Sequence, residues 1–130
     1  MTQPQYCKWT DSRGRTEYEG KVRRWKPGKT CRATGKGLEL CTDGVLHFYA
    51  HPLLAVFLDP IYSNYTAFAE PLLWRVEPVG EIVTDGTKCG AKQLRAIEVI
   101  KRPPKLATDQ RVRAAILCAW DVCNDAAWRA

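Results

Sequence analysis

Hydrophobic and polar residues alternate along several short stretches of the chain, and this alternation predicts strands. Leu72, Trp74 and Val76 fall on one face of residues 72–77, which is the period of a half-buried strand. Residues 45–49 are rich in β-branched and aromatic side chains, which indicates a buried strand. Residues 92–100 fit either a strand or a helix, and we prefer a strand. Between these last two segments, residues 84–87 (Thr-Asp-Gly-Thr) predict a turn.

Two further segments have helical patterns. Pro52 suits the first position of a helix, and the apolar residues that follow it predict a short, deeply buried helix that ends at Asp59-Pro60. Thr108 is a candidate N-cap for a longer helix over residues 108–128. Its apolar stripe consists of Val112, Ile116, Ala119 and Cys123, broadened by Leu117 and Trp120, with Trp128 as a last anchor. The expected fold class is α+β: an antiparallel or mixed sheet with one short buried helix and a C-terminal helix packed on it.

Composition supports one folded domain over residues 1–130. The length is typical of a single domain, and 5 Trp, 5 Tyr and 3 Phe argue against disorder. No apolar run approaches the roughly 20 residues that span a bilayer, and the first residues do not form a signal peptide. We therefore expect a soluble, cytoplasmic protein without a membrane partner.

The 6 cysteines are expected to be mostly free and buried. A disulfide framework would fit a secreted chain, and no secretion signal is present. Disulfides and a metal site remain the alternatives to free thiols.

Charge is distributed unevenly along the chain. Residues 1–37 hold ten basic and three acidic residues, residues 38–98 hold four and eight, and residues 99–130 hold six and three. The formal net charge of +6 therefore combines a basic N-terminal region, an acidic middle and a basic tail. Residues 18–25, a turn at Lys26-Pro27-Gly28-Lys29 and residues 30–32 predict a basic hairpin region over residues 18–37.

This basic region holds the candidate binding residues. They are Lys21, Arg23, Arg24, Trp25, Lys26, Lys29, Arg32 and Lys36. Cations around an aromatic side chain could follow a phosphate backbone and stack a base, or they could meet an acidic protein surface. A third interpretation is a solvated hairpin whose charges protect an edge strand.

The sequence has no recognisable catalytic or metal-binding motif. His47 and His51 are spaced like zinc ligands on a helix, but a strand and Pro52 are expected there instead. A pairing of Cys41 or Cys89 with His47 has no local signature. We therefore predict no cofactor and no metal, and an enzyme is the less favoured class.

Two stretches resemble a small domain family of unknown function found in phages, prophages and bacteria. They are residues 40–53 (LCTDGVLHFYAHPL) and residues 79–92 (VGEIVTDGTKCGAK). The C-terminal helix also resembles a tail seen in phage-associated proteins. The resemblance spans residues 20–102, and it implies an origin in a phage or mobile element without assigning functional residues.

A second, looser resemblance is to small ADP-ribosyltransferase folds. Residues 44–49 followed by residues 52–58 are similar to the strand and short helix of those folds. Glu98 is the one candidate for their catalytic glutamate, although it has no clear closing strand around it.

These observations lead to three functional hypotheses. The first is a non-enzymatic phage protein that inhibits a bacterial defence complex, in the manner of an anti-CRISPR protein. Its basic patch would contact an acidic protein surface or a nucleoprotein complex in the host cytoplasm, with Trp25 or Tyr62 as an interface anchor. The alternatives are a nucleic-acid-binding module that uses the same patch, and an ADP-ribosyltransferase-like enzyme.

Overall fold

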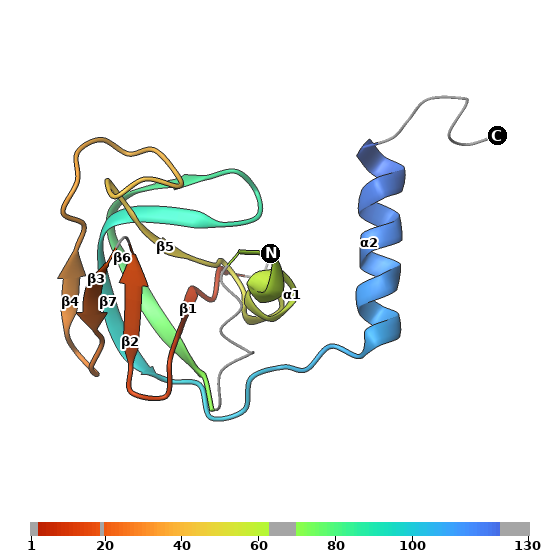
Figure 1. Ribbon diagram of the computed structural model, residues 1–130, viewed down its shortest axis with the longest axis horizontal. Helices are drawn as coiled ribbons and strands as arrows, with labels where there is room; N and C mark the ends of the chain where they lie inside the picture. The colour runs from red at the N-terminus through yellow and green to blue at the C-terminus, as the bar shows by residue number, and fades with distance from the viewer. Residues whose placement is uncertain (1–2, 19, 63–69, 123–130) are drawn as a thin grey trace.

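The computed structural model describes residues 3–18, 20–62 and 70–122. This part of the chain forms seven strands and two helices (Figure 1). Their bounds are β1 Cys7–Thr10, β2 Arg15–Tyr18, β3 Lys21–Arg24, β4 Thr30–Arg32, β5 Leu46–Phe48, α1 Pro52–Tyr62, β6 Leu72–Thr84, β7 Cys89–Val99 and α2 Thr108–Val122. The α+β fold class expected from the sequence is confirmed, and every strand pair is antiparallel.

A five-stranded sheet closes on itself to form a small barrel. Its order is β1-β6-β7-β4, and β5 pairs with the same edge of β7 that β4 uses further along. The gap between β5 and β1 is closed by Cys7 and Tyr49, whose backbone groups exchange hydrogen bonds of 2.8 and 2.9 Å. The strand β1 therefore lies between β6 and β5 and closes the ring of strands.

The long hairpin of β6 and β7 is the centre of this sheet. The sequence placed strands at residues 72–77 and 92–100 and a turn at residues 84–87, and the structure confirms all three. Asp85 accepts hydrogen bonds from the backbone N–H groups of Thr87 and Lys88, which fixes the turn and lowers the pKa of its carboxyl to about 2. Register shifts after Arg75 and after Val79 bend β6.

Both faces of β6 are buried at its start, which the period-two pattern does not indicate. Trp74 and Val76 belong to a core inside the barrel, whereas Leu73 belongs to a second core under α1. Leu72, which the alternation placed on the buried face, is only partly buried. A strand between two cores loses the simple alternation because each face has its own apolar neighbours.

The predicted basic hairpin of residues 18–37 is wrong in its strand pairing. The turn at residues 26–29 is present, with a 3.0 Å hydrogen bond from the N–H of Lys29 to the carbonyl of Lys26. However, β3 pairs with β2 in a separate two-stranded sheet, and β4 pairs with β7. Gly20, with φ of 81°, allows the tight connection that joins β2 to β3.

Helix α1 covers the second core. Ala55, Val56 and Leu58 are buried there, and the indole N–H of Trp9 donates a 2.8 Å hydrogen bond to the carbonyl of Ala55. Two details differ from the expectation. The helix continues to Tyr62 instead of ending at Asp59-Pro60, and Leu53 is exposed.

Helix α2 is present, but the packing expected for it is not. Figure 1 shows it clear of the barrel, at the end of an extended segment. Val112, Ile116 and Leu117 are 50%, 56% and 68% exposed, so its apolar stripe does not cover the sheet. Arg111 tethers the helix by donating to the backbone carbonyls of α1. The expected extension over residues 123–128, with Cys123 and Trp128, lies outside the described residues.

Candidate binding cleft

A cleft of about 350 Å³ lies between the β2–β3 hairpin, the loop before β5, and β5 itself. Its charged lining comes from β1, β2, β3, the loop and the residue before β7. Those residues are Lys8, Glu17, Lys21, Arg23, Asp43 and Lys88. Aromatic side chains also line it, among them Tyr18 and Phe48. The cleft thus combines an apolar surface with four basic and two acidic groups.

Lys8 lies where β1 faces the cleft. Side chains alternate along a strand, so Cys7 and Trp9 enter the core under α1 while Lys8 points to the other side. Its ammonium donates to the carbonyl of His47 and lies 5.7 Å from the ring centroid of Trp25. Burial, together with the nearby charge of Arg23, lowers the pKa of Lys8 to about 8. The sequence does not mark this residue, because a single Lys in a short strand carries no signal.

His47 holds the loop in front of the cleft. Its Nε2 accepts a 2.8 Å hydrogen bond from the backbone N–H of Cys41, a residue with φ of 63°. Burial lowers the pKa of His47 to about 4, and the charges of Lys8 and Lys88 act in the same direction. The imidazole is therefore neutral at pH 7. Because the Cys41 amide occupies Nε2, this nitrogen does not serve as a base for the Cys41 thiol.

Two further contacts fix the walls of the cleft. The hydroxyl of Tyr18 on β2 lies 3.4 Å from the carbonyl of Cys41 and donates to it across the cleft. Lys92 on β7 donates to the carbonyls of Gly35, Gly37 and Gly44 at 2.7, 3.1 and 2.9 Å. One ammonium thus holds together three points of the loop that carries Cys41. The sequence did not single out either side chain.

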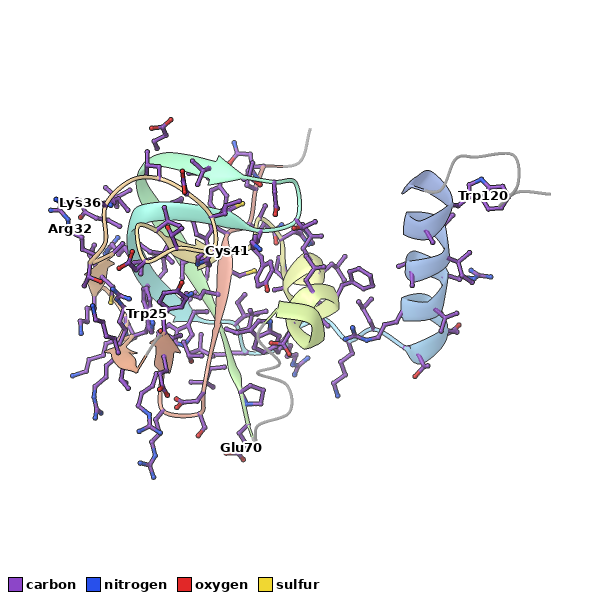
Figure 2. The ribbon with its side chains drawn as sticks, turned by 45° about the horizontal axis from the view of Figure 1, so that its top comes forward. Trp25, Arg32, Lys36, Cys41, Glu70 and Trp120 are labelled. Carbon is purple, nitrogen blue, oxygen red and sulfur yellow. The ribbon has the colours of Figure 1, made fainter. Side chains whose placement is uncertain are left out.

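The predicted basic residues separate into two groups. Lys21 and Arg23 line the cleft, and Arg23 also donates to the carbonyl of Arg32 at 3.2 Å. The others are exposed on the outside of β3, β4 and their connections, where Figure 2 shows Arg32 and Lys36 pointing away from the barrel on the same side. This outer group, called here the outer basic face, consists of Arg24, Lys26, Lys29, Arg32 and Lys36.

Trp25 does not belong to either group, since it is only 3% exposed. It lies in the barrel core, and its indole N–H donates a 2.9 Å hydrogen bond to the hydroxyl of Thr16. Its ring is therefore not available to stack a base or to anchor an interface. The side chain of Tyr62, the other predicted anchor, lies outside the described residues.

Four cysteines are described, and they are free thiols. Cys7, Cys31 and Cys89 are buried as expected, whereas Cys41 is exposed. Burial raises the pKa of Cys7 to about 12, so this thiol stays protonated. The side chain of Cys118 and all of Cys123 lie outside the described residues. Within those residues, no cluster of His, Cys, Asp and Glu side chains has an arrangement that would hold a metal ion.

Glu98, the candidate transferase residue, lies away from the cleft. It is on the exposed surface of β7 and forms a 3.0 Å ion pair with Arg75 on the neighbouring strand. It does not line the cleft that contains His47. The structure thus does not bring these two residues into one site.

Comparison with protein-family models, with curated proteins and with solved structures found no match. The resemblance to phage-associated domains therefore stays a prediction. Neither described helix has the length and apolar character needed to cross a membrane.

Proposed function

We propose that this protein is a non-enzymatic binding protein that docks its outer basic face onto an acidic partner. As its role we propose inhibition of a bacterial defence complex, in the manner of an anti-CRISPR protein. The observation that carries the proposal is the concentration of five exposed cations in one short segment, residues 24–36. The ion pairs among the described residues involve Arg15, Arg75 and Arg95, so these five cations are not neutralised by such pairs.

The arrangement suits fast, charge-guided association. Like charges on one face raise the local potential, which increases the association rate with an oppositely charged surface and makes this rate depend on salt. An acidic protein surface is favoured over nucleic acid, because Trp25 is buried and no aromatic ring of the outer basic face can stack on a base.

The proposal is tested in bacteria that carry an active CRISPR system. Expression of the protein is expected to restore plaque formation by a phage that this system targets, and to have no effect in cells without the system. The triple variant Lys29→Glu, Arg32→Glu and Lys36→Glu should abolish this effect. A matched control reverses Lys101, Arg102 and Lys105, which are exposed outside the face. Unchanged immunity with the wild-type protein, or equal loss with both triple variants, would contradict the proposal.

The rate of association with the purified defence complex tests the electrostatic part of the proposal. The outer-face variant should associate about tenfold more slowly than the control, and the difference should shrink at high salt. An electrophoretic shift of duplex and single-stranded DNA is the parallel measurement. Salt-sensitive DNA binding without binding to the complex would replace the proposal with the nucleic-acid alternative.

A further inference from the structure

The cleft described above has the size of a small-molecule site. Its volume of about 350 Å³ lies within the range of about 300–1,000 Å³ that is typical of ligand pockets. It is also distinct from the outer basic face, because none of the five residues of that face lines it. A ligand of this cleft would therefore be a different molecule from the acidic partner of the proposed function.

The charges in this cleft favour an anion. Four of its lining residues are basic, while only Glu17 and Asp43 are acidic. The ammonium of Lys8 contacts a backbone carbonyl and the face of Trp25, and neither contact is with a carboxylate. Neither Lys8 nor Arg23 belongs to the ion pairs among the described residues, which involve Arg15, Arg75 and Arg95. A partly buried ammonium beside Arg23 would gain from a counter-anion, because buried charges are usually paired.

The remaining lining limits what the anion can be. Tyr18 is the exposed aromatic side chain among the lining residues, and its ring would accept a flat organic body. The two acidic groups reduce the excess charge to +2, which matches a singly or doubly charged group better than a polyanion. A carboxylate or a phosphate monoester meets both conditions.

We propose that this cleft binds a small organic anion, whose carboxylate or phosphate group lies between Lys8 and Arg23 and whose flat body lies against the ring of Tyr18. The lowered pKa of Lys8 agrees with this site, since burial and the charge of Arg23 disfavour the ammonium and a bound anion would offset both. Lys8 and Arg23 would be ligand-binding residues, and the Tyr18–Cys41 hydrogen bond would keep the hairpin and the loop at the required spacing.

Two pairs of probes test the proposal and distinguish its two ligand chemistries. Uridine 5′-monophosphate is compared with uridine, and benzoate is compared with benzyl alcohol, by chemical-shift titration of the full-length protein. An anionic probe should bind saturably and about tenfold or more tightly than its neutral counterpart. Binding of the nucleotide alone identifies a phosphate site, and binding of benzoate alone identifies a carboxylate site. If neither anion binds better than its neutral counterpart, the proposal is wrong.

Neighbouring residues on β3 supply a matched pair of variants. Arg23 lines the cleft, whereas Arg24, the next residue, belongs to the outer basic face. Arg23→Gln should weaken the anionic probe by about tenfold, and Arg24→Gln should leave its affinity unchanged. Lys8→Met keeps the apolar stem and removes the charge, so it should weaken binding similarly. If Lys8→Met does not fold, the Arg23 and Arg24 pair decides alone, and equal weakening by both would overturn the site.

Discussion

Replacement of Lys92 by Met tests the contact that organises the loop in front of the cleft. The ammonium of Lys92 donates to three backbone carbonyls, those of Gly35, Gly37 and Gly44. Methionine fills a similar volume but cannot donate. The variant therefore leaves these carbonyls without their charged partner while it changes the packing little.

The expected loss of stability follows from the number and burial of these bonds. A hydrogen bond to a charged group contributes about 1.5–3 kcal/mol net. The bonds to Gly35 and Gly44 are short and partly buried, whereas the bond to Gly37 is exposed, so water can replace it. Because the three bonds share one ammonium, they do not add fully. We expect the free energy of unfolding to fall by about 3 kcal/mol, which corresponds to a decrease in Tm of roughly 10 °C.

Urea unfolding followed by tryptophan fluorescence measures this change. Arg95→Met is the matched control, since Arg95 lies on the same strand and forms only an exposed 3.4 Å ion pair with Glu77. Such a pair contributes about 0–1 kcal/mol. If Lys92→Met and Arg95→Met destabilise the protein equally, the loop does not depend on Lys92 and the reasoning is refuted.

Two further predictions follow from His47 and Trp25. Because the folded-state pKa of His47 is lowered to about 4, below its ordinary value of 6.5, the neutral imidazole stabilises the fold at neutral pH. Stability should therefore fall between pH 6.5 and pH 4, and His47→Gln should flatten this part of a pH series of urea midpoints; a slope equal to that of the wild type would contradict the assignment. Trp25→Phe should lower the free energy of unfolding by about 2–3 kcal/mol, through a cavity and the lost bond to Thr16. Circular dichroism melting tests it, and a stability change below 1 kcal/mol would contradict its placement in the core.

Local features of the fold could be predicted from the sequence. The turn at residues 84–87 depends on Asp85 and its immediate neighbours, and the start of α1 depends on Pro52. Such signals act within a few residues, so they are present in the sequence itself. Residues 45–49 and 92–100 were also assigned correctly, because β-branched and alternating residues favour strands over a short range.

Long-range choices could not be predicted. Residues 18–32 have the turn and the alternation of a hairpin, yet Cys31 enters the barrel core and β4 therefore joins β7. Lys8 and His47 meet only because the barrel brings β1 next to β5. The expected role of Trp25 failed for the same reason: charged neighbours in the sequence suggested exposure, whereas the core around it determines its burial.

The pairing of β1 has a consequence for synthesis on the ribosome. Cys7 pairs with Arg75 and Thr10 pairs with Leu72, so the ladder partner of the first strand emerges only after α1. At about 5–20 residues per second, β1 waits for several seconds with Trp9 exposed and both edges open. The barrel cannot close until β7, which pairs with β4, β5 and β6, has also left the exit tunnel. A chain truncated before β6 should therefore depend on chaperones, because neither of its cores can be completed.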